Sequence, residues 1–487
     1  MVIEKFLRLQ VGYLLRVLIA MVLLLVSCSK LDEELRPSIL VSMENIGTYK
    51  DHEITVKENY VLRLDAECNN DYRLSDEAII SNMLSFAYEE TVGSDNVGIS
   101  TLDYSGIDIR SIRPLYETVT LSSFSETKAA IPPMVVEFSG PDGDGYAVCS
   151  GDKRYEQVFA YVPYGDLSDT VNNPTLGYFY KSVEYSINDS IAKFNSIVDS
   201  LTNLGYKYEY PNLVKYSDDD DGPINPLPPG MIYLGKYFDV EKEGNAQLNM
   251  KMQWGQGYPY NDSMAEKSGF YMRDPINLRA LAGCTSIALG QAMAYKKSSY
   301  YPFITSKWNA IRELKTIEGT EYASDVALFI AALGEDTYVK YGMDGTTTSW
   351  MYISDFFDVK GIKYESIERV RYDTATDKEK ITNFIFNSCN NKNPVIVHAK
   401  DTQQGFEHAF IIHGVDFKQG MYYEVIGTEP PDGGGMNKMY RLLEYKYDLY
   451  VQINWGWNGR GDGRFYWNQF KVLNDNYDYI TMLYTFQ

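Results

Sequence analysis

Cys284 is the residue of this 487-residue chain that is best placed for nucleophilic chemistry. It opens residues 284–295, where small side chains recur at helical spacing, so the sequence predicts a helix with a cysteine at its N-terminus. The positive end of a helix dipole lowers the pKa of a thiol toward that of a reactive thiolate. The same pattern is also typical of a buried cysteine that only fills space in a core. Cys284 is therefore a candidate nucleophile whose role depends on a suitable partner.

The partner of a catalytic thiolate is usually a histidine that acts as general base, and the chain has 4 histidines. His52 lies far upstream, in the N-terminal half. Two of the other three lie in residues 408–415, which have the pattern of a β-strand. Side chains alternate between the two faces of a strand, so His408 and His413 cannot both face one site. The pattern by itself leaves His398, His408 and His413 as alternatives.

The composition excludes several classes of function. The chain has 45 Lys+Arg against 66 Asp+Glu, a net charge of −21, so no nucleic-acid partner is expected, because binding phosphates needs a basic surface. The hydrophobic share of 45% is that of a globular protein, and 5 cysteines are too few for a disulfide-built scaffold. Cys68 and Cys149 could pair in an exported domain, but spacing cannot decide this. No cofactor or metal is expected, since the carboxylates of residues 217–223 lack the full spacing of a calcium loop.

The N-terminus has the pattern of an export signal. Basic residues precede an apolar run from residue 17 to 26, which is shorter than the roughly 20 residues that span a bilayer. Residues 25–28 resemble the lipobox of bacterial lipoproteins, in which the cysteine is acylated. This resemblance implies that residues 1–27 are a lipoprotein signal peptide and that Cys28 anchors an exported protein to a bacterial membrane, at the outer membrane or the cell surface. An ordinary signal peptide followed by an incidental cysteine is the alternative.

Residues 28–215 mix helical and strand patterns. Ser75, followed by acidic residues, predicts a helix that begins at the next position. Strand-like runs at residues 134–138 and 158–162 are separated by a turn-rich segment, and residues 188–204 have the spacing of an amphipathic helix. We therefore expect this region to form a small α+β domain.

The remaining chain divides at a sharp change in composition. Residues 216–234 contain four adjacent aspartates and several prolines, which predict an exposed linker open to proteolysis. In residues 235–487 helices and strands mix without regular βαβ alternation. That pattern favours an α+β domain over a doubly wound parallel sheet.

Four ordered motifs in residues 235–487 resemble the streptopain family of papain-like cysteine peptidases. This resemblance implies a papain-like α+β peptidase domain, preceded in residues 28–215 by a smaller α+β prodomain that inhibits it. It also implies a zymogen that is activated by cleavage between about residues 205 and 240. The four motifs are residues 254–261, 283–285, 407–414 and 453–463, and residues 74–78 and 145–154 resemble two prodomain segments.

The resemblance also implies a role for each matching residue. Cys284 is expected to attack the carbonyl of a protein or peptide substrate and form a thioester, with His408 paired to it as a thiolate–imidazolium couple. Gln256 is expected to donate its amide N–H to the oxyanion, together with the backbone N–H of Cys284. The residues expected to hold or wall the His408 ring are Asn454, Trp455 and Trp457.

Three departures from the family pattern keep other functions open. Glu407 stands where the family usually has glycine, His413 replaces the usual aspartate, and an insert that includes residues 427–435 is either a lip over the cleft or a surface loop. These features allow an alternative, a catalytically inactive surface lipoprotein that binds peptides or glycans. Acyl transfer to an amine, as in papain-like transglutaminases, is a further alternative because Asp416 follows the histidine.

Overall fold

The part of the chain that the computed structural model describes begins at residue 72 and ends at residue 486. Residues 1–71, and with them the expected signal peptide, Cys28, His52 and Cys68, lie outside the described residues. The described residues are 72–92, 106–115, 131–168, 174–203, 232–264, 274–341, 346–368, 375–401, 406–428, 437–467 and 480–486.

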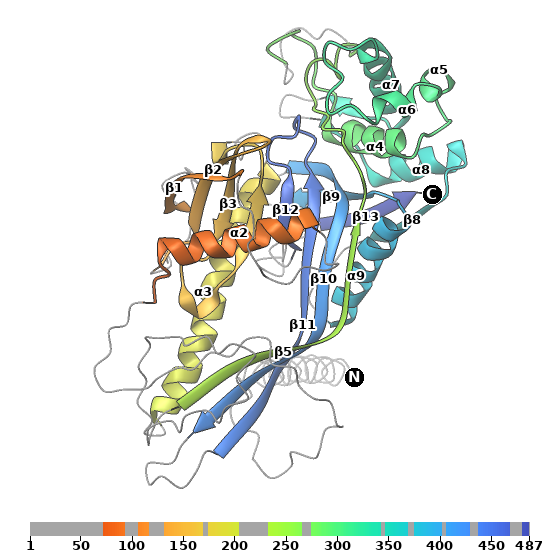
Figure 1. Cartoon of the computed structure of the whole chain (residues 1–487). Helices are drawn as coiled ribbons and strands as arrows, with labels where there is room; N and C mark the ends of the chain where they lie inside the picture. Colours follow the sequence, from red (N-terminus) through yellow and green to blue (C-terminus); the bar gives the residue numbers. More distant parts are fainter. Residues whose placement is uncertain are drawn as a thin grey trace, which may run out of the picture. The chain divides into compact units, whose positions relative to one another are not determined.

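The described chain folds as helices around one large antiparallel sheet (Figure 1). Its 11 strands follow the order β1-β2-β3-β4-β12-β11-β10-β9-β13-β8, with β5 paired to β10 outside this path. This arrangement confirms the expected α+β class. The strands of this sheet are β1 (Asp108–Pro114), β2 (Met134–Gly140), β3 (Gly143–Cys149), β4 (Val158–Val162), β5 (Ile232–Gln247), β8 (Tyr364–Glu368), β9 (Val395–Asp401), β10 (Phe406–Thr428), β11 (Asn437–Asn454), β12 (Gly463–Tyr466) and β13 (Ile480–Phe486).

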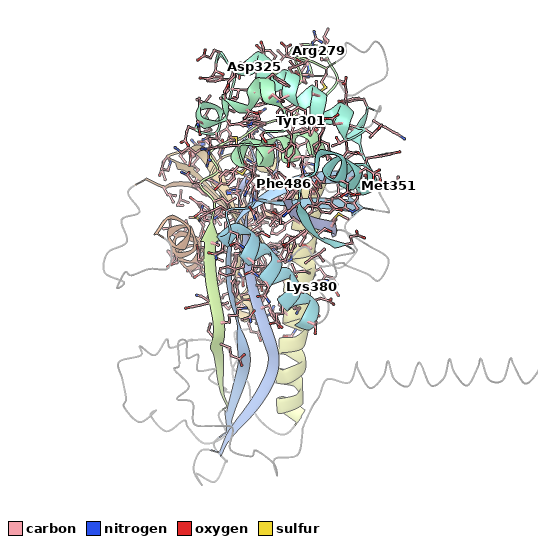
Figure 2. All side chains as sticks on the ribbon, turned by 90° about the vertical axis from the view of Figure 1, so that its right-hand side faces the viewer. Arg279, Tyr301, Asp325, Met351, Lys380 and Phe486 are labelled. Carbon is pink, nitrogen blue, oxygen red and sulfur yellow. The ribbon has the colours of Figure 1, made fainter. Side chains whose placement is uncertain are left out.

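The helices are mostly short and gather in the C-terminal half of the chain. Met351 and Lys380 point outward from two of them, and Tyr301 lies among the helices (Figure 2). The helices are α2 (Asp76–Val92), α3 (Pro174–Asn203), α4 (Cys284–Tyr295), α5 (Pro302–Thr305), α6 (Trp308–Ile311), α7 (Ala323–Asp336), α8 (Trp350–Lys360) and α9 (Ala375–Asn390).

The expected elements of the N-terminal region are present. The Ala78 N–H donates to Ser75 Oγ over 3.2 Å, which is the capping bond predicted for the start of α2. The strand-like runs become β2 and β4. The helix expected over residues 188–204 is α3, which begins earlier, at Pro174, because proline is favoured in the first turn of a helix.

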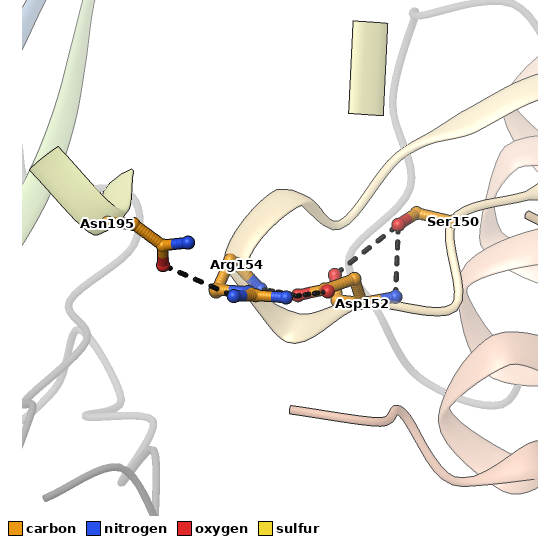
Figure 3. Close-up of polar contacts among 4 residues, drawn as sticks. All are labelled: Ser150, Asp152, Arg154 and Asn195. Atoms are coloured by element: carbon orange, nitrogen blue, oxygen red, sulfur yellow. Dashed lines mark hydrogen bonds and ion pairs between the residues drawn. The ribbon is translucent and has the colours of Figure 1, made fainter. Parts of the chain in front are cut away.

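Two segments that resemble the family prodomain lie side by side. The Leu74 N–H donates to the Gly151 carbonyl over 2.9 Å. Asp152 is fully buried and accepts from both the backbone N–H and the guanidinium of Arg154, which also donates to Asn195 on α3 (Figure 3). Asp152 and Arg154 therefore tie the entry of α2, the β3–β4 connection and α3 together.

The sheet runs without interruption from the N-terminal region into the C-terminal one. β4 pairs with β12 through Tyr161 with Arg464 and Ala160 with Phe465. The Phe179 ring of α3 packs edge-on against Phe465, with 5.2 Å between ring centroids. The expected prodomain and peptidase segments thus share one sheet and one core, and the expected domain limits stay a prediction.

The insert after the histidine strand lengthens a hairpin. β10 and β11 pair from Ile411 with Asn454 to Thr428 with Asn437. β5 follows the other edge of β10 as far as Thr428 (Figure 1). Because β5 begins at Ile232, the last three residues expected in the linker, 232–234, are already strand. Residues 216–231 and 429–436 lie outside the described residues.

Three findings bear on other expectations. Cys149 and Cys389 are free, buried thiols, and burial raises the pKa of each to about 12. In the described ranges, no helix combines the length and the apolar character that crossing a membrane requires. The same ranges hold no cluster of three His, Cys, Asp or Glu side chains arranged to bind a metal.

Asp152→Ala is expected to destabilise the fold by about 3–5 kcal/mol, because it leaves the buried Arg154 guanidinium without its main acceptor. Urea unfolding of the full chain measures this loss. The matched control is Arg110→Ala, which breaks the exposed pair with Asp144 and is expected to cost no more than about 1 kcal/mol. Equal losses in the two variants would contradict this account.

Candidate active site

Cys284 is the first residue of α4, as the sequence predicts. Gly283 precedes the helix at φ 91°, a backbone conformation that favours glycine. A Cβ at Gly283 would also lie 2.6 Å from the Thr346 hydroxyl, so a larger residue cannot stand there without displacing it. Every residue of α4 is buried, and its small side chains let Gly290 approach Ile330 closely. The helix therefore holds Cys284 rigidly inside the protein.

The electrostatics of Cys284 differ from the expectation. Its thiol accepts hydrogen bonds from backbone N–H groups at the helix start and from that of Ala409, and these bonds lower its pKa. Burial has the larger effect, since the side chain is only 8% exposed, and it raises the pKa of Cys284 above its ordinary value. The expected lowering of the pKa is therefore wrong for this structure, because loss of solvation outweighs the helix N-terminus.

His408 lies on β10 in a slot made of aromatic rings. The rings of Trp455 and Trp457 lie nearly parallel to the imidazole, with centroid distances of 6.1 and 6.2 Å, and Phe410 lies at 6.1 Å. A hydrogen bond to the backbone of Trp455 raises the pKa of the imidazole, so the backbone atom must be the carbonyl that accepts from the ring N–H. Burial dominates and lowers the pKa of His408 to about 4.

Cys284 and His408 are neighbours through the main chain, since Cys284 interacts with the residue that follows His408. Nevertheless, the interactions that shift the pKa of His408 come from Trp455 and His398 and not from Cys284, and His408 Nε2 is buried without a hydrogen-bond partner. Burial thus disfavours the charged form of both groups. The expected thiolate–imidazolium couple is therefore not formed in this structure.

The three histidines left open by the sequence occupy different environments. His398 of β9 lies opposite Ala409 in the sheet, and its Nε2 is 3.9 Å from Glu407 Oε2. The Glu407 side chain therefore lies near His398. His413 lies at the irregularity between Ile412 and Gly414, where pairing with β11 shifts register. His408 alone among the three has described stacking contacts with the tryptophan segment. The geometry favours His408 as the base.

Gln256 lies on a loop that is fastened to both halves of the site. Its carbonyl accepts from the Ala282 N–H over 2.8 Å, two residues before the nucleophile. The preceding Gly255 forms a bridge with Trp457. Asp274 accepts from the backbone N–H of Tyr258, two residues after Gln256, and so holds the far side of the loop. The loop therefore places Gln256 beside the start of α4, where an oxyanion donor is needed.

The hydrogen bonds described for the Asn454 side chain are made with groups other than the His408 ring that it was expected to hold. Its side chain bonds with Gln291 of α4, with the Met252 carbonyl and with the Gly456 N–H, at 2.8–3.2 Å. Gln291 also accepts from the Trp254 N–H over 3.2 Å. Asn454 thus joins α4 to the strand end, while the carbonyl of Trp455 holds the imidazole.

Sequence reasoning missed three supporting residues, which are Gln291, Asp274 and Asp462. Gln291 gave a signal, because it is the one amide in an otherwise small and apolar helix. Asp462 lies in the motif of residues 453–463, but the sequence did not indicate a role for it. Its carboxylate accepts from the Trp455 N–H over 2.7 Å. Asp274 gave no signal, because its partners are backbone groups 2 and 16 residues away.

Alkylation of Cys284 in the full-length chain is expected to be slow at neutral pH and to accelerate only at a more alkaline pH than that of an ordinary thiol, because burial raises the pKa of Cys284. Peptide-resolved mass spectrometry after iodoacetamide treatment across a pH series measures this profile. As a control, His408→Ala should leave the profile unchanged, since no ion pair is present to be lost. A rate that is already high and flat at acidic pH would show a preformed thiolate.

Comparisons with known proteins place this site in a family. Residues 254–466 match the model of the Peptidase C10 family. No curated protein matches the chain. A prointerpain A fragment from Prevotella intermedia is 17% identical, with a TM-score of 0.44, and the match covers 74% of this chain and 97% of that one. Active interpain A cysteine protease from the same organism is 19% identical, with a TM-score of 0.32 and coverage of 50% and 94%.

The family match contains all four motifs that resemble streptopain, together with every candidate catalytic residue. The resemblance stated from the sequence is therefore confirmed. The segment from residue 254 to residue 466, somewhat less than half of this chain, thus matches the Peptidase C10 family, that is, the family of streptopain-like cysteine peptidases.

Proposed function

We propose that this protein is an exported, lipid-anchored cysteine endopeptidase that is made as an inactive precursor. The observation that carries the proposal is the pairing of two features within the family domain. Cys284 opens a buried helix, and the residue after His408 contacts its thiol. Gln256 and the tryptophan segment border the same place.

The proposed reaction is acyl transfer through a thioester. Cys284 loses its proton to His408, attacks the carbonyl carbon of the scissile peptide bond and forms a tetrahedral oxyanion. The Gln256 amide and the backbone N–H of Cys284 stabilise this charge, and loss of one such donor typically costs about 3 kcal/mol. His408 then protonates the leaving amine. It next takes a proton from water, which hydrolyses the thioester and frees Cys284.

The uncharged state of the catalytic pair supports the precursor proposal. A buried thiol and a buried neutral imidazole cannot attack efficiently, because the thiolate is the nucleophile. The N-terminal segment holds the tryptophan turn in place. The Gly461 N–H donates to the Tyr164 carbonyl over 3.0 Å, and Arg460 pairs with Asp166 at 2.8 Å. Removal of the inhibitory prodomain would free this turn to rearrange around His408.

Strand pairing narrows the proposed activation site. Cleavage was expected between about residues 205 and 240, but residues 232–247 form β5, which is hydrogen-bonded to β10. A protease needs an extended backbone that is not engaged in a sheet. We therefore place the cut before Ile232, which leaves β5 in the mature enzyme.

A binding module on an inactive peptidase fold is the second candidate, and the unformed Cys284–His408 ion pair favours it. Acyl transfer to an amine has less support. Asp416, which that reaction would use beside the histidine, already pairs with the buried Arg464 at 2.7 Å. Hydrolysis of peptides therefore remains the function that the site supports best.

N-terminally processed protein is expected to cleave casein at discrete positions, and Cys284→Ala is expected to abolish cleavage because no nucleophile remains. Mass spectrometry of the digest measures both activity and residue preference. In parallel, an epoxide inhibitor of cysteine peptidases should label Cys284 in the processed protein and fail to label His408→Ala. Processed protein that neither cleaves nor is labelled would instead favour the binding module.

Cys28→Ala is expected to move the full-length protein from the detergent phase to the aqueous phase in a detergent partition experiment, because the proposed lipid is attached there. Metabolic labelling with a fatty acid measures the modification directly. Serine at the neighbouring position offers a control, since Ser29→Ala should leave partition and labelling unchanged. A Cys28→Ala variant that stays in the membrane would disprove the anchor.

A further inference from the structure

We infer that Asp462 is a positioning residue for His408 and that it acts through the peptide group of Trp455. This inference rests on the proposed function, because it assigns Asp462 to the same site. The links run from the Asp462 carboxylate to the Trp455 N–H, and from the Trp455 carbonyl to the imidazole.

The turn after Trp455 brings Asp462 back to that residue. The Arg460 N–H donates to the Trp457 carbonyl over 3.1 Å, and the Asp462 N–H donates to the Gly459 carbonyl over 3.3 Å. The chain therefore reverses within a few residues. Its last carboxylate then lies 2.7 Å from the Trp455 nitrogen.

The hydrogen bond from the Trp455 N–H to Asp462 affects His408 because the N–H and the carbonyl of Trp455 are attached to the two sides of one α-carbon. The N–H bond limits rotation of the main chain at Trp455, and so it limits where the carbonyl can point. The same residue carries one of the indole rings stacked on the imidazole. One hydrogen bond from Asp462 therefore constrains both the acceptor and the wall of the His408 slot.

The burial of a carboxylate at this position is unusual. Asp462 is 9% exposed, and the one hydrogen bond described for its carboxylate comes from Trp455. A buried carboxylate with so few donors is costly, whereas an amide or hydroxyl oxygen could accept the same bond without a charge. Buried acids that are kept in this way are typical of functional sites.

The charge of Asp462 responds to pH in the physiological range. Burial raises its pKa to about 7, while the Trp455 bond and the cation of Lys315 lower it. Lys315 itself pairs with Asp142 at 3.3 Å. An ionised carboxylate is the stronger acceptor, so the hold on Trp455 weakens as the pH falls through about 7. Because burial raises the pKa of Asp462 from 3.8 to about 7, the stability of the fold falls as the pH rises between these two values and stays lower above about 7.

The test compares Asp462→Ala with Asp462→Asn in the full-length Cys284→Ala chain, by nitrogen NMR of the histidine rings. Asp462→Ala is expected to release the Trp455 peptide, so the His408 ring loses its single tautomer and its pKa falls further. Asp462→Asn should keep the wild-type ring signals, because the amide oxygen accepts the same bond. Arg110→Ala is the control and should also keep them, because it breaks only an exposed ion pair outside this turn. Unchanged His408 signals in Asp462→Ala would overturn the inference.

Kinetics of the processed enzyme supply the second measurement. Asp462→Ala is expected to lower kcat by up to about 100-fold with little change in KM, since a displaced base slows the reaction more than substrate binding. Asp462→Asn should restore most of kcat and remove the loss of activity as the pH falls through about 7. Asp462→Asn should also unfold at no lower urea concentration than the wild type above that pH, which separates positioning from a merely structural role.

The two measurements fail independently. If the wild-type processed protein shows no peptidase activity while the His408 ring still depends on Asp462, the proposed function fails and the positioning role stands. If the enzyme is active and Asp462→Ala retains both kcat and the His408 signals, the positioning role fails alone.

Discussion

Burial of the Cys284 thiol and the His408 imidazole is the constraint on which the rest of the site depends. Each side chain is nearly inaccessible to water, and this burial disfavours the charged form of each. The backbone donors at the start of α4 act in the direction that favours a thiolate, but they are too weak to offset the loss of solvation. A change in solvation, rather than any new catalytic group, is what the site needs to become reactive.

The supporting contacts explain why such a change can be controlled. The nucleophile stands on a helix that is hydrogen-bonded to the strand end through the side chains of Gln291 and Asn454. The base depends on a turn that closes on itself through Asp462 and is contacted by the N-terminal segment through Tyr164. The rigid half therefore carries Cys284, and the adjustable half carries the groups that orient His408.

The continuous sheet connects the N-terminal region directly to the turn that orients His408. β4 pairs with β12 directly beside the tryptophan turn, so the region expected to inhibit the enzyme is bonded to the strand that follows Asp462. Arg464 on β12 also donates to the Phe86 carbonyl of α2 while it pairs with Asp416. Loss of the N-terminal region would unpair one edge of β12 and leave a buried cation with fewer acceptors.

The sequence by itself determined the class of fold, the start of α4, the strands at residues 134–138 and 158–162, and the family, because these depend on local periodicity, capping and ordered motifs. It could not choose the base among three histidines without the resemblance. Tertiary structure decided the protonation of Cys284, the role of Asn454 and the place of Asp462. The reason is physical: solvation and hydrogen bonding depend on groups that are distant in the chain, as the contact of Cys284 with Ala409 demonstrates.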